Sequence, residues 1–325
     1  MTFDSESELE KIAAKCPAAR CVLRIKADDP AAVVVFGAKY GAHPYEEAPA
    51  LLRAAKRLGL AVTGVSFHVG SGSQSADAYP NAIAAARHVA DLARGLGYSI
   101  DLLDIGGGFF GRFDVSGEVA IAGVAASVNE ALARHFPHDC GVAVIAEPGR
   151  YFAEACSTLF TMVHTVKELR AAADGALVGR SLFVTDGVYG SFNGVIYDHA
   201  AITAAVLRSP RLPPPDAADP WAPTTVFGPT CDSIDLIFKG LPMPALRVSD
   251  WLQFPELGAY SVAGACAFNG LPMDAPTRFY VFSNAPCDKA VPRCVEVRRG
   301  GDAAPSAAEP ALRFVGDVHD LDVLS

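Results

Sequence analysis

The sequence predicts an α/β protein with a β-rich second half, and three observations support this fold class. Residues 1–150 alternate short apolar runs with amphipathic stretches of helical length, which is typical of a parallel sheet or a (β/α) barrel. After Tyr151 the helical periodicity fades, and β-rich runs separated by turns replace it. Hydrophobic residues make up 51% of the 325 residues and charged residues 19%, so the chain can bury a large core.

The first half begins with the end of a strand at Met1–Asp4 and a helix capped by Ser5. Glu8 follows three residues after Ser5, which is the spacing of a capping box. The remaining strands are expected at Cys21–Ile25, Ala61–Val69, Ser99–Ile105 and Val142–Ala146, and the helices at Glu46–Leu58, Ala76–Leu96 and Val119–Phe136.

The second half predicts an antiparallel β domain interrupted by surface loops at Arg211–Pro223, which is proline-rich, and at Gly300–Pro310. Its strands are expected at Leu159–Val166, Ser181–Thr185, Thr224–Phe227, Trp251–Phe254, Ala259–Ala267, Phe279–Ser283 and Cys294–Arg298.

A division into domains follows from this change of pattern. Residues 1–152 are expected to form a (β/α) barrel domain and residues 153–325 a β-sandwich or β-barrel domain. A (β/α)8 barrel usually takes about 250 residues, and the first half supplies too few strands for one. The barrel is therefore predicted to be incomplete, with roughly the first three βα units missing.

Composition excludes several classes of partner. The net charge of −9 is spread along the chain without a basic patch, so no nucleic-acid partner is expected. No apolar run reaches membrane-spanning length, and the polar N-terminal stretch does not resemble a signal peptide. The eight cysteines form no C-x-x-C pair, so we expect reduced thiols in a cytoplasmic protein, and we expect no metal site.

Four stretches carry residues suited to chemistry. LLDIGGGFF ends an apolar run with Gly106, Gly107 and Gly108, whose bare backbone N–H groups can bind a phosphate; the alternative is a plain βα turn. VSFHVGSG places His68 and Ser71 at the end of a strand, where an imidazole can stack on an aromatic cofactor or can simply end the strand.

The other two stretches carry charges and a thiol. AEPGRY sets Glu147 three residues before Arg150, which suits a ring nitrogen and a phosphate, or only a local salt bridge. GPTCDSID pairs Cys231, a possible proton donor, with Asp232, which can receive a cation; a lone cysteine is more often a small buried hydrophobe.

Together these motifs identify a family. VSFHVGSG, LLDIGGGF, AEPGRY, DGVYGSFN…YDHA, GPTCDSID, GAYSVA and FNG occur in this order. The sequence resembles the eukaryotic-type ornithine decarboxylases, in the alanine-racemase-like group of pyridoxal-phosphate enzymes, from Met1 to about Asn284. The resemblance implies decarboxylation of L-ornithine to putrescine with pyridoxal 5′-phosphate as the cofactor. It also implies a homodimer whose two subunits share their active sites, and antizyme as a protein partner.

The resemblance also implies roles for single residues. His68 stacks on the pyridine ring, Glu147 pairs with its nitrogen, and Cys231 from the partner subunit protonates Cα. The 5′-phosphate contacts and the substrate contacts form two further sets. They are Ser71, Gly106, Gly107, Gly108, Arg150 and Tyr260 for the phosphate, and Asp198, Asp232 and Tyr189 for the substrate.

One departure from the family is expected to matter. The lysine that attaches the cofactor lies in a P-x-Y-A-V-K-like motif in the family, and no lysine of this chain has that context. We therefore expect the chain as it stands to be inactive and truncated at its N-terminus. Two alternatives stay open: a non-catalytic regulator like the antizyme inhibitors, and a decarboxylase of lysine, arginine or diaminopimelate. Asp198 and Asp232 suit a distal ammonium without a carboxylate, which argues against diaminopimelate. Lysine differs from ornithine by one methylene, which allows an enzyme only about 1–3 kcal/mol of discrimination, so the sequence does not separate these two substrates.

Overall fold

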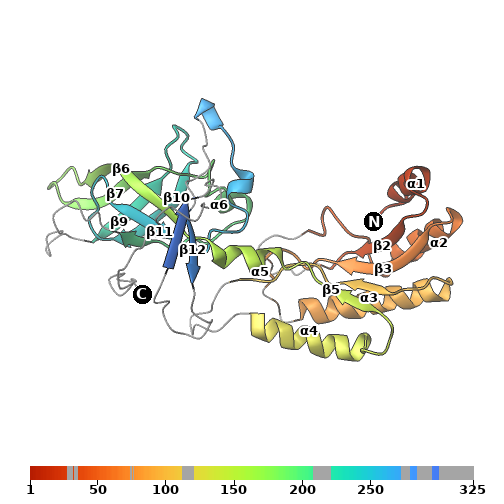
Figure 1. Cartoon of the computed structure of the whole chain (residues 1–325). Coiled ribbons are helices and arrows are strands. Elements are labelled where there is room, and N and C mark those ends of the chain that lie inside the picture. Colours follow the sequence, from red (N-terminus) through yellow and green to blue (C-terminus); the bar gives the residue numbers. More distant parts are fainter. Residues whose placement is uncertain are drawn as a thin grey trace, which may run out of the picture. The chain divides into compact units, whose positions relative to one another are not determined.

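The computed structural model describes residues 1–27, 32, 36–73, 75, 77–111, 121–207 and 221–271, and the backbone of 279–283 and 295–299. The chain divides into two compact units, which Figure 1 shows. The first unit comprises Met1–Leu159, Gly194–Ala201 and Pro255–Ser261, and the second comprises Phe160–Asn193, Ile202–Phe254 and Val262–Ser325. Two short segments from late in the sequence thus pack with the N-terminal half, while the predicted domain boundary after residue 152 stays a prediction.

A five-stranded parallel sheet forms the centre of the first unit, in the order β1-β2-β3-β4-β5. Its strands are β1 (Thr2–Phe3), β2 (Arg20–Ile25), β3 (Ala61–Phe67), β4 (Leu102–Asp104) and β5 (Ala143–Ile145). Each strand pairs with the next in sequence, so right-handed crossovers place all the connecting helices on one face. These helices are α1 (Glu6–Lys15), α2 (Ala48–Arg57), α3 (Ala78–Gly95) and α4 (Ile121–His135), and α3 and α4 lie side by side in Figure 1.

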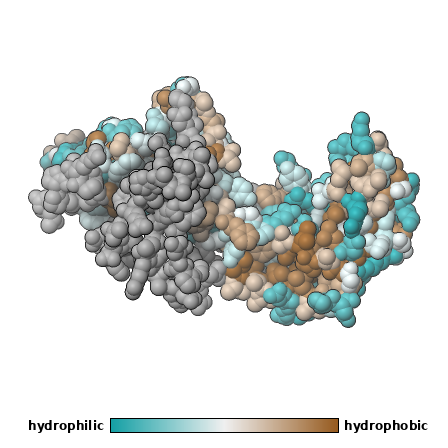
Figure 2. Space-filling model, in the orientation of Figure 1, coloured by the Kyte–Doolittle hydropathy of each residue, from teal (hydrophilic) through white to brown (hydrophobic). Residues whose placement is uncertain are grey.

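The two faces of this sheet differ in polarity. One large core of Leu, Ile, Val and Ala side chains joins the strands to the helices, with Leu23, Leu52 and Ile83 fully buried. Arg24, Ser66 and Asp104 are paired in register on three neighbouring strands, so their side chains share one face. Val144 and Ile145 of β5 are exposed, and Figure 2 shows apolar surface on this unit.

The elements predicted for the first half are present, and every strand except β2 is shorter than predicted. Ser5 caps α1 as expected, and its hydroxyl accepts a hydrogen bond from the Glu8 N–H at 3.4 Å. The strand predicted to reach Val69 ends at Phe67, because His68 already turns to accept a hydrogen bond from the Gly70 N–H. The strand predicted to reach Ile105 ends at Asp104, whose carboxylate binds the Gly106 N–H and starts the turn.

The second unit contains a six-stranded sheet in the order β10-β9-β7-β6-β11-β8. The strands are β6 (Leu159–Arg170), β7 (Leu177–Val184), β8 (Ala205–Leu207), β9 (Ala222–Phe227), β10 (Leu236–Met243) and β11 (Trp251–Phe254). The prediction of a purely antiparallel domain is wrong at one pair, because β7 and β9 run parallel. A separate antiparallel pair joins β12 (Phe279–Ser283) and β13 (Val295–Arg299).

Three further expectations fare differently. A strand over Ala259–Ala267 is wrong: Tyr260 has a φ of 51°, which breaks extended backbone, and the segment forms the 3-10 turn η2 (Val262–Gly264). Sequence patterns missed β8, which has only three residues, and β10, whose pairing with β9 shifts register around Lys239 and Gly240. The predicted loop at 300–310 and most of the loop at 211–223 lie outside the described residues, although Pro223 belongs to β9.

Among the residues that the structure describes, no helix is both long enough and apolar enough to cross a membrane. In the same part of the chain, no group of three or more His, Cys, Asp and Glu side chains is arranged to hold a metal ion.

Two glycines of the first unit are expected to respond oppositely to alanine. A Cβ on Gly64 in β3 would lie 2.8 Å from the Leu102 carbonyl oxygen, whereas a Cβ on Gly95 at the end of α3 would meet nothing within 4 Å. Gly64→Ala should lower the free energy of unfolding by about 1–3 kcal/mol, and Gly95→Ala should raise it by about 0.5–1 kcal/mol. Urea unfolding of both variants checks this; equal effects would contradict the tight spacing of β3 and β4.

Candidate active site

The candidate site lies at the carboxyl ends of β3, β4 and β5. His68 follows β3, Gly106 follows β4 and Glu147 follows β5, and the Glu147 N–H donates to the Gly106 carbonyl at 2.8 Å. Parallel strands bring their carboxyl ends to one edge of the sheet, which is where active sites of (β/α) enzymes are built. The structure therefore brings together three residues that the sequence places in separate motifs.

The three glycines form a turn in which side chains have no room. A Cβ on Gly107 would lie 2.7 Å from the Glu147 carbonyl oxygen and 2.8 Å from Nε2 of His68. Gly106 and Gly108 have φ values of +65° and +104°, which side-chain-bearing residues rarely adopt. The Tyr79 hydroxyl holds the turn by donating to the Gly107 carbonyl at 2.9 Å. The triplet is thus required by close approach, which brings its backbone beside His68 and Glu147.

His68 carries a neutral imidazole. Burial lowers its pKa to about 4, the positive charge of Arg24 adds to this shift, and Asp104 opposes it. Its Nδ1 accepts the Gly70 N–H at 3.1 Å, so the ring proton of the neutral form resides on Nε2. Phe36 packs edge-on against the ring at 4.9 Å between centroids. At neutral pH the ring is therefore an uncharged plate of fixed orientation.

Glu147 is the acidic member of the site. Loss of hydration, together with a hydrogen bond to Asp104 and the negative charge of that carboxylate, raises the pKa of Glu147; the Arg24 guanidinium opposes the shift. Glu147 is consequently a better proton acceptor than an ordinary glutamate.

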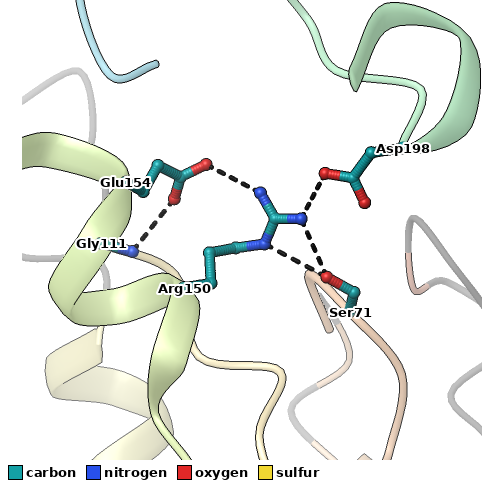
Figure 3. A network of polar contacts seen from close by, with 5 residues as sticks. All are labelled: Ser71, Gly111, Arg150, Glu154 and Asp198. Carbon is teal, nitrogen blue, oxygen red and sulfur yellow. Dashed lines mark hydrogen bonds and ion pairs between the residues drawn. The ribbon is translucent and has the colours of Figure 1, made fainter. Parts of the chain in front are cut away.

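Arg150 is a buried cation at the centre of a polar network, shown in Figure 3. It lies in the short helix α5 (Gly149–Ala153), and its Nε and Nη2 donate to the Ser71 hydroxyl at 3.1 and 3.0 Å. Nη1 donates to Glu154 at 3.2 Å, and Nη2 also pairs with Asp198, at the end of α6 (Gly194–Tyr197). The Tyr260 ring lies 4.8 Å from the guanidinium carbon.

A second polar cluster belongs to the second unit. The Tyr189 hydroxyl donates to Asp232 at 2.5 Å. This hydrogen bond lowers the pKa of Asp232 and is the main cause that raises the pKa of Tyr189 to about 12. Cys231, next to Asp232, is exposed, and its sulfur accepts a hydrogen bond from Asn269. The predicted residues Tyr189, Cys231 and Asp232 thus form one cluster.

Sequence reasoning missed three polar residues. Glu154 is buried and binds both Arg150 and the Gly111 N–H; its spacing of four residues from Arg150 was a usable signal. Arg24 affects both His68 and Glu147, but it stands inside an ordinary strand and gives no local signal. Asn269 lies in the FNG motif, which says little about a partner 38 residues away.

The fold and the site together define a class of protein. A parallel βα sheet carries a glycine turn, a buried arginine and an acid–imidazole pair at its carboxyl edge, and a separate β-sheet unit follows; this is the arrangement expected of an alanine-racemase-like pyridoxal-phosphate enzyme. Residues 1–154 match the family described as "Pyridoxal-dependent decarboxylase, pyridoxal binding domain", and residues 88–258 match its "C-terminal sheet domain". The chain belongs to the pyridoxal-dependent decarboxylases, whose cofactor is pyridoxal 5′-phosphate.

Individual relatives are similar over most of this chain. Ornithine decarboxylase of Mus musculus is 42% identical over 290 residues, which are 87% of this chain and 61% of the relative. Antizyme inhibitor 2 of Xenopus laevis is 39% identical over 90% of this chain and 61% of its own length. The crystal structure of the Paramecium bursaria Chlorella virus arginine decarboxylase is 38% identical with a TM-score of 0.74, covering 83% of this chain and 68% of that one. The chain therefore spans about three fifths of the curated relatives it matches.

The Arg150–Glu154 pair should contribute strongly to stability. Glu154→Ala leaves the buried guanidinium without one of its carboxylates, and we expect the free energy of unfolding to fall by about 3–5 kcal/mol. The matched control is Glu130→Ala in the Glu130–Arg134 pair, which has the same spacing and is mostly exposed, and it should cost less than about 0.5 kcal/mol. Denaturant unfolding measures both; similar losses would contradict the burial of Arg150.

The charge state of His68 predicts a pH dependence. Its folded pKa lies below its unfolded value of about 6.5, so the unfolded chain binds the proton first and stability is lost as pH falls from about 6.5 to 4. The histidine NMR resonance that disappears in His68→Gln should titrate near pH 4. His68→Gln should also lose less stability than the wild type across this window. A midpoint near 6.5 would show that the ring is hydrated and uncoupled from Arg24.

Proposed function

We propose that the first unit binds pyridoxal 5′-phosphate and that the protein decarboxylates L-ornithine to putrescine. The observation that carries this proposal is the convergence of His68, Gly107, Glu147 and Arg150 at one edge of the parallel sheet. Membership of the pyridoxal-dependent decarboxylases and 42% identity to an ornithine decarboxylase support the reaction and the substrate.

The residues at the sheet edge fit the cofactor. The absence of a side chain on Gly107 lets the turn pack against Glu147 and His68, the two residues proposed to contact the pyridine ring, so the phosphate-binding backbone and the ring contacts lie together. The Arg150 guanidinium and the Ser71 hydroxyl already meet and would hold the 5′-phosphate, together with the backbone of Gly106, Gly107 and Gly108 and the ring of Tyr260. The bound cofactor would supply an electron sink for the pair that remains on Cα when carbon dioxide leaves.

His68 and Glu147 would act on the ring itself. The neutral imidazole of His68 can stack on the pyridine without adding a positive charge. The carboxylate of Glu147 would hold a proton on the ring nitrogen, and its raised pKa brings its basicity closer to that of the nitrogen. Asp104 contributes to this raised pKa of Glu147.

The substrate contacts involve both clusters. Asp232 is a carboxylate whose pKa the Tyr189 hydrogen bond lowers further, so it can bind the distal ammonium of a basic amino acid, as can Asp198. Cys231 would donate its thiol proton to Cα after carbon dioxide leaves. We propose that Cys231 and Asp232 serve the site of a partner subunit in a homodimer. Solved relatives named as arginine and lysine decarboxylases keep those two substrates as alternatives.

Three wider properties complete the proposal. The single-face arrangement of the helices supports a sheet that is part of a (β/α)8 barrel, because a doubly wound sheet carries helices on both faces. The lysine motif of the family does not occur in the chain, so we propose that the chain as given binds the cofactor without turnover. A cytoplasmic location and an interaction with antizyme are proposed from the resemblance to ornithine decarboxylases.

A second candidate is a non-catalytic regulator. The 39% identity to an antizyme inhibitor favours it. Uptake of the cofactor separates the two candidates, because a regulator that binds no cofactor should leave pyridoxal phosphate free in solution.

We expect pyridoxal phosphate to bind the chain, and Ser71→Ala to weaken that binding about fivefold to tenfold through loss of a hydrogen bond to an anion. Equilibrium dialysis measures the cofactor affinity, with Ser157→Ala as the control for an exposed serine.

In a full-length protein that carries the cofactor lysine, Cys231→Ala should leave cofactor affinity intact and cut putrescine formation at least about 100-fold. Cys156→Ala, another exposed thiol, should change neither. Unchanged putrescine formation in Cys231→Ala would remove Cys231 from its role, and absence of cofactor binding would favour the regulator.

A further inference from the structure

The Cys231 thiol is held by a residue from another turn. Cys231 lies on the exposed loop between β9 and β10, and buried Asp235 anchors that loop by accepting the Thr230 N–H at 3.0 Å and the Thr230 hydroxyl at 2.7 Å. These bonds fix the backbone just before Cys231 but not its side chain. The sulfur itself accepts a hydrogen bond from Nδ2 of Asn269 at 2.9 Å.

Asn269 has a backbone conformation suited to few residues. It lies in the 3-10 turn η3 (Phe268–Gly270) with φ 57° and ψ 27°, and Gly270 after it also has a positive φ. Among residues with side chains, Asn and Asp tolerate this left-handed conformation best. Of these two, Asn alone brings N–H donors, so the position combines the allowed backbone with a donor for sulfur.

Phe268, which precedes Asn269, holds Asp232, which follows Cys231, through Tyr189. The Phe268 ring stacks on Tyr189 with 3.9 Å between centroids and 9° between planes, and the Tyr189 hydroxyl binds Asp232. The Cys266 N–H also donates to the Tyr189 carbonyl at 2.9 Å, which ties Tyr189 to the same segment. Two consecutive residues of η3 therefore hold two consecutive residues of the loop, Asn269 directly and Phe268 through Tyr189.

We propose that Asn269 is a positioning residue that orients the Cys231 thiol and stabilises its sulfur when the proton leaves. The inference rests on the proposed function of Cys231 as proton donor. In that step the S–H bond breaks, a C–H bond forms at Cα, and the sulfur keeps the electron pair as a thiolate. An N–H aimed at sulfur favours the charged form, and solvent returns the proton because Cys231 is exposed.

Alkylation of the chain by iodoacetamide tests the contact without requiring turnover. Asn269→Asp and Asn269→Gly both keep a residue that tolerates the left-handed turn, so neither should disturb the fold. At pH 8, peptide-resolved mass spectrometry should show Cys231 reacting about tenfold more slowly in Asn269→Asp and about threefold more slowly in Asn269→Gly, because the thiolate meets a carboxylate or loses its donor. Cys156 and Cys16, both exposed, should react at unchanged rates.

Two alkylation results would overturn the inference. One is Cys231 reacting within twofold of the wild-type rate in Asn269→Asp; the other is Cys156 slowing by the same factor, which would indicate a general change of fold.

Turnover of a full-length protein that carries the lysine distinguishes this inference from the proposed function. Asn269→Asp should lower kcat about tenfold and leave KM unchanged, because Tyr189 still holds Asp232. An unchanged kcat in Asn269→Asp, with turnover still dependent on Cys231, would overturn the inference alone. Turnover independent of Cys231 would overturn the proposed function.

Discussion

The burial of one guanidinium is the constraint on which the site depends. A buried arginine must find partners for its charge and its N–H groups, and Arg150 finds them in Ser71, Glu154 and Asp198, with the Tyr260 ring packed nearby. These partners come from the loop after β3, the end of α5, the end of α6 and the segment 255–261. The segments 194–201 and 255–261 both belong to the first unit, and Arg150 contacts one residue of each, Asp198 and Tyr260.

Two charged residues on the polar face of the parallel sheet influence the pKa values of His68 and Glu147. Arg24 and Asp104 stand in register on β2 and β4, with Ser66 between them on β3. The positive charge of Arg24 adds to the effect of burial on His68, while Asp104 makes Glu147 hold its proton more readily. Loss of hydration is the largest cause of both shifts, and Arg24 and Asp104 adjust them in opposite directions.

Sequence patterns predict the parts of this structure that depend on local signals. The Ser5 cap, the glycine turn and the positions of His68 and Glu147 after strands all follow from motifs of a few residues. Contacts between distant segments could not be predicted in this way: the Asn269–Cys231 hydrogen bond and the Arg150–Asp198 pair need the folded chain. The sequence did not predict β10, because Lys239 and Gly240 interrupt its alternation of apolar and polar residues. No residue pattern in β7 or β9 indicates that the two strands pair in parallel.

The Arg150–Asp198 ion pair has a consequence for the order of events. The cation proposed to hold the cofactor phosphate and the anion proposed to hold the substrate ammonium satisfy each other in this structure. Under the proposed roles, a phosphate that binds first would replace Asp198 as a partner of Arg150, whereas an amine that binds first would leave a buried positive charge with one carboxylate fewer. The proposed roles therefore predict that the cofactor binds before the amino acid.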